Sequence, residues 1–412
     1  MDDSRRPRAG AAARAVLPSD GSHAPRRRIL VLNERDLENP LAGGAEVHVL
    51  EIFRRLVERG HHVQLLAASF PGSKPVAVTN GVPVRRLANR YLYYAAVPFA
   101  VRRMVAKGRI DVVVDVLNKV PFLTPWITDV PCCAIVHHLF GATAFRHVSF
   151  PVALATYLTE MLVPRAHRRT PMLAISASTH DDLVARGVVA ENITVVPPGL
   201  DHALYTPGES GRAPLLVWVG RLERYKRADV MIDAMPRILQ HVPAARLAII
   251  GSGHARTELE QHTRRRGVAH AVEFTGYVVE ERKVDYLRRA SILVNTSEKE
   301  GFGLTVIEAN ACGTPSVSSN VAGLRDSVRD GETGLLVPFG DVTALASAVV
   351  RLLTSPQLRE RLATNGIAWA RSFSWERCAD AVEEMIERAI AMDTSPQRGA
   401  DQARAHGGVE TR

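Results

Sequence analysis

The sequence predicts an α/β protein of two Rossmann-like, doubly wound domains that face each other across a cleft. Short runs rich in Val, Ile and Leu alternate with amphipathic stretches, which is typical of parallel sheets covered by helices on both faces. This pattern occurs twice, and a Pro/Gly-rich segment without periodicity, 201–214, separates the two copies. A chain of 412 residues is long enough for two such domains.

The first domain is predicted over residues 27–200 and begins with RRILVLN, a buried strand that ends at Asn33. A helix is expected over 45–60, with Gly60 as its C-cap. A second helix is expected over 178–187, from a Ser/Thr start to a Gly stop. Further strands are predicted at 61–69, 110–116, 132–138, 172–178 and 192–199.

The second domain is predicted over residues 215–374 and repeats the alternation. Its strands are predicted at 215–220, 246–253, 272–278, 291–297, 314–320 and 333–338. Its helices are predicted at 227–243, 283–290 and 301–313. Residues 375–392 form a strongly amphipathic helix at the end of the folded region. The cleft between two such domains is the expected ligand site.

Composition narrows the function classes. The net charge of +9 fits a polyanion, an anionic membrane surface or a phosphate-bearing small molecule, although an Arg-rich composition also follows from a GC-rich genome. Residues 1–26 and 393–412 are predicted to be disordered tails. The four cysteines lack ligand spacing, so we expect reduced thiols, no metal site and a cytoplasmic location.

The segment Glu300-Gly-Phe-Gly-Leu-Thr-Val-Ile-Glu308 is the most informative. Its glycines let the backbone approach a ligand, and the helix that starts there offers free N–H groups to an anion. Glu308 lies two turns into the helix, where its two oxygens could bind vicinal hydroxyls. Two isolated glutamates would more simply be a capping and a surface residue, but the full context favours a ligand site.

In each predicted domain, the turn after the first strand is a further candidate ligand site. Gly220-Arg221-Leu222-Glu223-Arg224-Tyr225-Lys226 places Arg221 and Lys226 at the carboxyl edge of the second sheet, where they could neutralise a diphosphate. The alternative is a solvated basic loop, to which Arg224 and Arg227 more simply belong. Gly43-Gly44 is a phosphate-friendly turn from the first domain, or merely a tight turn. Neither G-x-G-x-x-G nor a P-loop is present.

Six segments occur in a characteristic order: GGAE (43–46), GRLERYK (220–226), IGSG (250–253), FTGYV (274–278), EGFGLTVIE (300–308) and ACGTPSV…AGLRDSVRDGETGLLV (311–337). With these segments the chain resembles the GT-B glycosyltransferases of family 4, which retain the anomeric configuration of the donor sugar. The resemblance covers residues 27–392 and is more specific in the second half. It implies a nucleotide-diphosphate sugar donor, no required cofactor or metal, and a last helix, 375–392, that packs back on the first domain.

The resemblance also implies residue roles. Arg221 and Lys226 would hold the donor diphosphate, Glu300 would contact the sugar hydroxyls, and Glu308 would bind the ribose. His137, at the end of a buried strand, is the preferred sugar contact over His138, and a packed or surface histidine is the alternative. The other donor contacts would come from Gly44, Gly251, Gly253, Tyr277, Val278, Phe302, Gly303 and Leu304.

Two positions depart from the family pattern, and the acceptor is less readable. Arg227 stands where members commonly have Gly, and Asp326 where they often have Glu, which leaves donor specificity open. The aromatic-basic segment 85–107 is either a membrane-docking surface or an ordinary solvated helix pair, and no nucleic-acid motif accompanies it. Asn118-Lys119 and Phe140-Gly141 are weaker acceptor-side candidates.

We therefore expect a metal-independent, retaining hexosyltransferase that uses a UDP-, GDP- or dTDP-sugar. Its acceptor would be a carbohydrate, a lipid-linked glycan or a small natural product, and the enzyme would be cytoplasmic or peripheral at the inner face of the membrane. The main alternative is a non-catalytic, nucleotide-sugar-binding partner subunit, against which the intact Arg221, Lys226, Glu300 and Glu308 argue.

Overall fold

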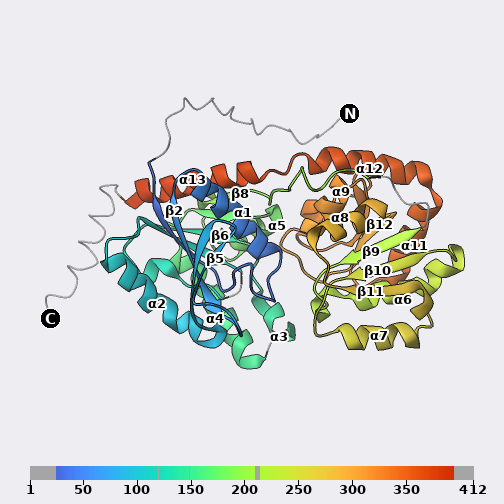
Figure 1. The fold of residues 1–412 in the computed structure, drawn as a ribbon, viewed down its shortest axis with the longest axis horizontal. Coiled ribbons are helices and arrows are strands. Elements are labelled where there is room, and N and C mark those ends of the chain that lie inside the picture. Colours follow the sequence, from blue (N-terminus) through green and yellow to red (C-terminus); the bar gives the residue numbers. More distant parts are fainter. Residues whose placement is uncertain (1–24, 119, 148, 209–213, 394–412) are drawn as a thin grey trace, which may run out of the picture.

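The computed structural model describes residues 25–118, 120–147, 149–208 and 214–393. The predicted disordered tails, 1–26 and 393–412, therefore lie almost wholly outside the described residues, as does part of the predicted hinge. Figure 1 shows two α/β domains side by side, each with its own sheet, and a long C-terminal helix that runs along the first domain.

The first domain contains an eight-stranded sheet of order β3-β4-β2-β1-β5-β6-β7-β8, parallel except for the β3–β4 pair. Its strands are β1 (Arg28–Leu32), β2 (His62–Ser69), β3 (Val76–Thr79), β4 (Val82–Asn89), β5 (Val112–Leu117), β6 (Cys132–Val136), β7 (Met172–Ala174) and β8 (Ile193–Val195). Alternate residues of the buried strands face opposite layers, as the period of two requires. For example, Val31 joins the core under α1 (Gly44–Glu58), whereas Leu30 packs with Tyr93 of α2 (Arg90–Ala106).

The second domain contains a six-stranded sheet of order β11-β10-β9-β12-β13-β14, with every strand pair parallel. Its strands are β9 (Leu215–Val219), β10 (Arg246–Ile250), β11 (Val272–Gly276), β12 (Ile292–Asn295), β13 (Ser316–Ser319) and β14 (Gly334–Val337). Its helices are α6 (Ala228–His241), α7 (Arg256–Arg265), α8 (Glu280–Arg289), α9 (Leu304–Ala311), α10 (Leu324–Ser327), α11 (Val342–Thr354) and α12 (Pro356–Ala370). The prediction of two parallel-sheet Rossmann-like domains is confirmed.

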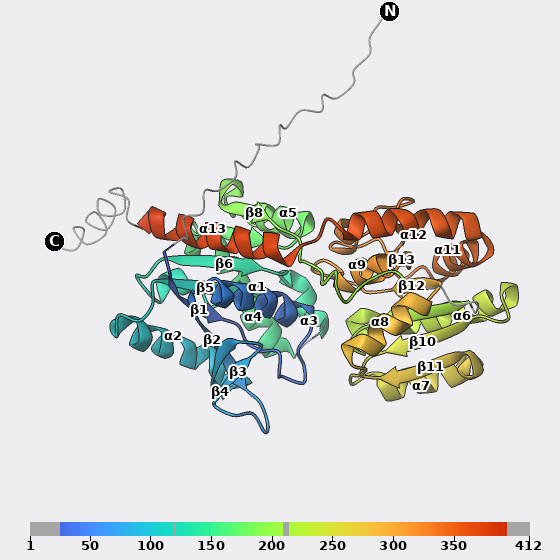
Figure 2. The ribbon, with the colours of Figure 1, turned by 45° about the horizontal axis from the view of Figure 1, so that its top comes forward.

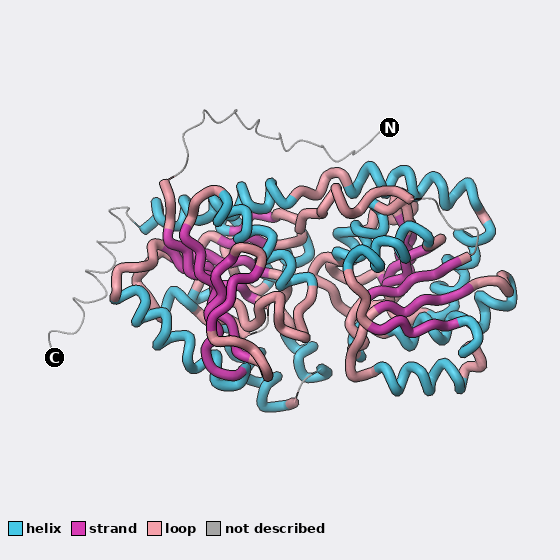
Figure 3. Tube along the Cα trace, in the orientation of Figure 1, coloured by secondary structure: helices cyan, strands magenta, loops and turns pink. Residues whose placement is uncertain are grey.

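Two segments cross between the domains. Leu200, before the hinge, pairs with Ser374, directly before α13 (Trp375–Asp393), in an isolated parallel bridge. Helix α13 then packs against α1, and Figure 2 shows it lying over that helix. Arg59, after α1, pairs with Asp380 and Glu383 of α13, each at 2.7 Å. Helix α13 is thus anchored on the first domain, along whose upper edge the helix runs in the view of Figure 3.

Some elements differ from the sequence prediction. The strand expected over 172–178 ends at Ala174, because Ser176 caps α5 (Ala177–Ala185) by accepting a hydrogen bond from the backbone N–H of Thr179. The β3–β4 hairpin was not predicted, although its turn carries Asn80-Gly81, both with positive φ. The helices α3 (Ala144–His147) and α4 (Phe150–Ala166) were also missed.

Candidate active site

The predicted site residues gather where the carboxyl ends of the two sheets approach each other. Glycines make this approach possible. A Cβ atom on Gly301, after β12, would lie 2.8 Å from the carbonyl oxygen of His137, after β6. A Cβ atom on Gly44, at the start of α1, would lie 2.8 Å from Cδ1 of Leu304, at the start of α9. Both glycines therefore sit at points where the domains touch.

Lys226 and Glu300 form an ion pair in the second domain. The Nζ of Lys226 lies 2.5 Å from Oε1 of Glu300, which also accepts a 2.8 Å hydrogen bond from the Oγ of Ser297. Burial lowers the pKa of Lys226, but attraction to Glu300 outweighs it and the net pKa shift is upward. The lysine therefore carries its positive charge in this site at neutral pH.

Arg221 reaches toward the first domain from the turn after β9. It donates hydrogen bonds to the Tyr225 hydroxyl, at 2.9 Å, and to the carbonyl oxygen of Leu41, at 3.5 Å. The same carbonyl accepts a 2.7 Å hydrogen bond from Arg35, a nearly buried arginine that the sequence did not single out. Burial lowers the pKa of Arg35. Two guanidinium groups thus converge on the Leu41 carbonyl, and the Nε of Arg221 would lie 3.9 Å from a Cβ atom on Gly43.

Glu308 also has a lysine partner that sequence reasoning missed. The Nζ of Lys283 lies 3.0 Å from Oε2 of Glu308 and 2.7 Å from Oε1 of Glu280. Burial lowers the pKa of Lys283, but the two carboxylates outweigh it and raise the pKa overall. The hinge residue Tyr205 donates its hydroxyl to the same oxygen of Glu280. The i,i+3 spacing of Glu280 and Lys283 on one helix predicts the contact between these two residues, but not the contact of Lys283 with Glu308.

The predicted backbone contacts fall into three groups. Gly251 and Gly253 have positive φ, and Cβ atoms there would collide with the backbone of the Gly220–Leu222 turn. Gly303 caps α9 in the left-handed region, between a buried Phe302 and Leu304. Their close packing explains why glycine occupies these positions, whatever ligand binds. In the third group, Tyr277 is exposed and Val278 half-buried at the end of β11.

His137 is placed in a packed environment. Its ring lies edge-on to that of His48 at 5.0 Å, and only 3% of the residue is exposed. Neither ring nitrogen has a hydrogen-bond partner among the described residues. Burial lowers the pKa of His137 to about 4, so the ring is neutral at pH 7. In this conformation the packed alternative describes the ring better than a side chain aimed into an open cleft.

Loops on the acceptor side are held by Glu160, which the sequence analysis did not identify. This fully buried carboxylate of α4 accepts hydrogen bonds from the backbone N–H groups of Phe140, at 2.7 Å, and Gly141, at 2.6 Å. Burial raises the pKa of Glu160 despite these bonds. From the second domain, Lys299 donates to the carbonyl oxygen of Leu139. Of the other acceptor-side candidates, Asn118 is half-buried and Lys119 lies outside the described residues.

The two departures from the family pattern have structural consequences. Arg227 adopts φ 52°, the left-handed conformation that glycine takes more readily, and pairs with Asp229 at 2.9 Å. Asp326 accepts hydrogen bonds of 3.3 and 3.4 Å from the backbone N–H of Ser178, in α5 of the first domain. The shorter acid therefore still reaches across the interface.

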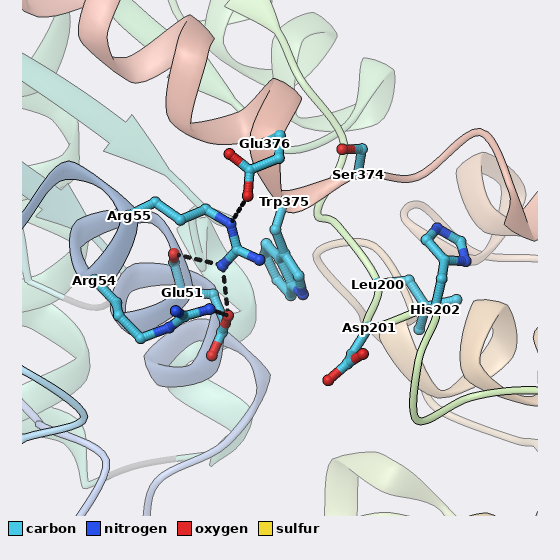
Figure 4. Close-up of a pocket in the computed structure, with 9 residues that line it drawn as sticks. All are labelled: Glu51, Arg54, Arg55, Leu200, Asp201, His202, Ser374, Trp375 and Glu376. Carbon is cyan, nitrogen blue, oxygen red and sulfur yellow. Dashed lines mark hydrogen bonds and ion pairs between the residues drawn. The ribbon is translucent and has the colours of Figure 1, made fainter. Parts of the chain in front are cut away.

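A cavity of about 540 Å³ lies away from these residues, between the hinge and the start of α13. Figure 4 shows Trp375 and Leu200 on its walls, with Arg55 linked to Glu51 and Glu376. None of the sequence-predicted site residues lines it. We therefore regard this cavity as a feature of the hinge, separate from the candidate active site.

Two features are absent from the described part of the chain. No group of three or more His, Cys, Asp or Glu residues there could hold a metal ion. Within the same residues, no helix is both long and apolar enough to cross a membrane.

Comparisons with known proteins agree with this architecture. Residues 206–369 match the family described as "Glycosyl transferases group 1", and residues 42–204 match "Glycosyltransferase Family 4". A D-inositol 3-phosphate glycosyltransferase of Acidothermus cellulolyticus is 30% identical over 92% of this chain and 94% of its own. Another, from Geodermatophilus obscurus, is 32% identical over 88% and 89%.

Solved structures share the fold. Sucrose-phosphate synthase from Thermosynechococcus elongatus has a TM-score of 0.77 at 23% identity, over 89% of this chain and 100% of its own. HepE from Anabaena, in complex with UDP-glucose, has a TM-score of 0.72 at 20% identity, over 88% and 100%. With both halves matched in order and a relative 30% identical over most of both chains, this chain belongs to the glycosyltransferases of group 1 and family 4 and has the GT-B fold.

Proposed function

We propose that this glycosyltransferase transfers a hexosyl unit from a nucleotide-diphosphate sugar to an acceptor hydroxyl, with retention and without a metal ion or other cofactor. The observation that carries the proposal is that Arg221 lies beside Gly43, that Gly44 meets Leu304 at the glycine-capped start of α9, and that Lys226 pairs with Glu300, four residues before that start. Such a cluster can neutralise a diphosphate in place of a divalent metal. The candidate nucleotides of the donor are UDP, GDP and dTDP.

In the proposed reaction, the bond between the anomeric carbon and the donor diphosphate breaks, and a bond to the acceptor oxygen forms on the same face of the sugar. The departing diphosphate oxygen takes the acceptor proton, so the protein supplies no general base. Arg221 and Lys226 stabilise the negative charge that grows on the diphosphate. Glu300 orients the sugar and Glu308 the ribose, while domain contact at Gly301 excludes water.

Donor binding requires the two ion pairs to rearrange. Lys226 would exchange Glu300 for the diphosphate, which frees the carboxylate for sugar hydroxyls. Lys283 would remain with Glu280, which frees the oxygens of Glu308 for the ribose. The ligand-free pairs keep both carboxylates oriented before the donor arrives. His137 would act as a neutral ring, through contact with the sugar rather than as an acid.

The acceptor would be a hydroxyl of a carbohydrate, a lipid-linked glycan or a small molecule, with peripheral membrane contact in the lipid-linked case. Because two relatives are named for D-inositol 3-phosphate, an inositol phosphate belongs in the acceptor panel.

The test measures nucleotide-diphosphate release from UDP-, GDP-, ADP- and dTDP-sugars, with and without EDTA and each acceptor. Release from one donor that survives EDTA and disappears in Arg221→Ala/Lys226→Ala would support the proposal. EDTA-sensitive release would remove the metal-independent part. Donor binding without release under any acceptor would favour the non-catalytic partner subunit, and no binding of any donor would refute the site assignment.

A further inference from the structure

Helix α4 exposes an apolar stripe. Phe150, Leu154, Leu158 and Met161 are 68%, 38%, 51% and 52% exposed. Their spacing of four, four and three residues places them on one side of the helix. The opposite side is buried through Ala153, Thr156, Glu160 and Val163. At 1.5 Å per residue, the 17-residue helix presents this stripe over about 25 Å.

A second exposed apolar surface lies on the same layer. Tyr91, Leu92 and Phe99 of α2 are each more than half exposed. Helix α2 packs on Leu30 and Val113, and α4 packs on Ala134 and Val136, which belong to one face of the first sheet. Figure 1 shows both helices on the side of the sheet away from α13.

A short bridge joins the two helices. Exposed Trp126 lies in the 3₁₀ turn Thr124–Trp126, which contacts α4, and Arg102 of α2 donates to the carbonyl oxygen of Ile127 directly after it. We call the exposed side of α2, this turn and α4 the α2–α4 face.

The α2–α4 face is also one-sided in charge. Residues 82–110 contain seven Lys and Arg and no Asp or Glu. Among residues 112–180, the acids Asp115 and Glu160 are fully buried, and Asp129, three residues after Trp126, is the one exposed acid. The exposed cations include Arg102 and Arg103 in α2, Lys107 directly after it and Arg165 in α4, whereas Arg146 is paired with Glu298 of the second domain.

An apolar stripe flanked mainly by cations, with Asp129 as the one exposed acid among residues 112–180, is the pattern of a helix that lies in the interface of an anionic bilayer. A protein partner would more often be met by charges of both signs, and a nucleic acid would leave the apolar stripe uncovered.

The same helix is tied to the active site. Glu160, on the buried side of α4, binds the backbone of Phe140 and Gly141, and Lys299 binds the carbonyl of Leu139 beside them. Lys299 directly precedes Glu300. A surface on which α4 rests is therefore one loop away from the place where the acceptor meets the donor sugar.

We propose that the α2–α4 face docks on an anionic lipid bilayer and presents the active site to an acceptor carried by that bilayer. The inference rests on the proposed transferase function, because it selects the lipid-linked class among the acceptors. Docking needs no spanning helix: the exposed stripe enters the headgroup region while the arginines and Lys107 stay at the anionic surface.

The test is co-sedimentation of the full chain with vesicles of phosphatidylcholine, with and without phosphatidylglycerol. The variant Leu158→Glu/Met161→Glu changes two exposed side chains, so its fold should persist, and circular dichroism checks this. The matched control is Val184→Glu/Val189→Glu, which introduces the same charge at exposed valines beside β8.

We expect the unchanged chain to bind phosphatidylglycerol vesicles and to release them at high salt. The α4 variant should bind at least about tenfold more weakly, and the control should bind like the unchanged chain. Equal binding by the α4 variant, or no binding by the unchanged chain, would overturn the inference. Loss of self-association in the α4 variant without vesicle binding would overturn it in favour of a second copy of this chain.

Donor release measured on the same three proteins separates the two proposals. Release that persists in all three, with no vesicle binding, would leave the transferase proposal intact and refute only the docking. Vesicle binding without release from any donor would support the docking surface and refute the proposed chemistry.

Discussion

The Lys226–Glu300 pair allows a quantitative test that needs no knowledge of the substrate. Its atoms lie 2.5 Å apart, and the side chains are only 17% and 15% exposed, so solvent screens the pair weakly. A charged hydrogen bond in such a setting contributes about 2 kcal/mol. We therefore expect a coupling energy of about 2 kcal/mol in a cycle of Lys226→Met, Glu300→Gln and the double variant.

Urea unfolding followed by tryptophan fluorescence measures this coupling. The losses of unfolding free energy in the two single variants should add up to more than the loss in the double variant, because each single variant leaves one polar group without its partner. A coupling energy below about 0.5 kcal/mol would refute the pairing, since that is the usual scatter of independent sites.

The same variants make opposite predictions for ligand binding. Lys226→Met should lower kcat by about 10²–10³, in line with the loss of one group that stabilises developing negative charge. Glu300→Gln should instead strengthen binding of the free nucleotide diphosphate, because Lys226 no longer has to leave a carboxylate. Weaker nucleotide-diphosphate binding by Glu300→Gln would contradict the exchange of partners, and calorimetry distinguishes the two results.

Three other predictions concern conformation and pH. The pKa of His137 falls from 6.5 to about 4 on folding, so its neutral ring contributes stability at neutral pH that is lost as the pH falls from 6.5 toward 4. In urea unfolding at several pH values, His137→Asn should therefore reduce the change of unfolding free energy between pH 6.5 and pH 4 by about 3 kcal/mol. Arg227→Gly should be more stable than Arg227→Ala by about 1 kcal/mol, because both lose the Asp229 pair but only glycine fits φ 52° freely; equal stabilities would contradict backbone strain. Gly301→Ala should separate the domains and lower activity, since its Cβ meets the His137 carbonyl, whereas Gly43→Ala, with ordinary contacts, should not increase the radius of gyration in small-angle scattering.

Local pattern was enough for most of the fold. Short, Val- and Ile-rich runs such as those in β1, β5 and β9 are typical of covered parallel strands, and the predicted glycine stops lie close to the observed helix ends. Helix α4 was missed because it is apolar on both its buried and its exposed side, so the sequence has little amphipathic period there. The β3–β4 hairpin was not predicted despite its Asn-Gly turn, because β3 has only four residues and most of them are not buried, which leaves a weak strand pattern.

The site was predicted less completely, for a physical reason. Sequence motifs identify residues that a ligand would touch, but the ligand-free partners of those residues are chosen by the fold. Lys283 reaches Glu308 from a neighbouring helix, and Glu160 reaches its loop over about twenty residues. Neither relation has a fixed spacing that a motif could encode.

The contacts across the domain interface also indicate how the enzyme would open. Arg146 and Glu298 form a pair in which the arginine is 73% exposed, and exposed pairs contribute little. The hydrogen bonds from Arg221 to Leu41 and from Ser178 to Asp326 are long, at 3.3–3.5 Å. By contrast, α13 is fixed to the first domain by several short ion pairs. Opening would therefore break these weak contacts together with the hydrogen bond from Lys299 to the Leu139 carbonyl, and bend the chain at Leu200 and Ser374, which leaves α13 in place and lets product leave.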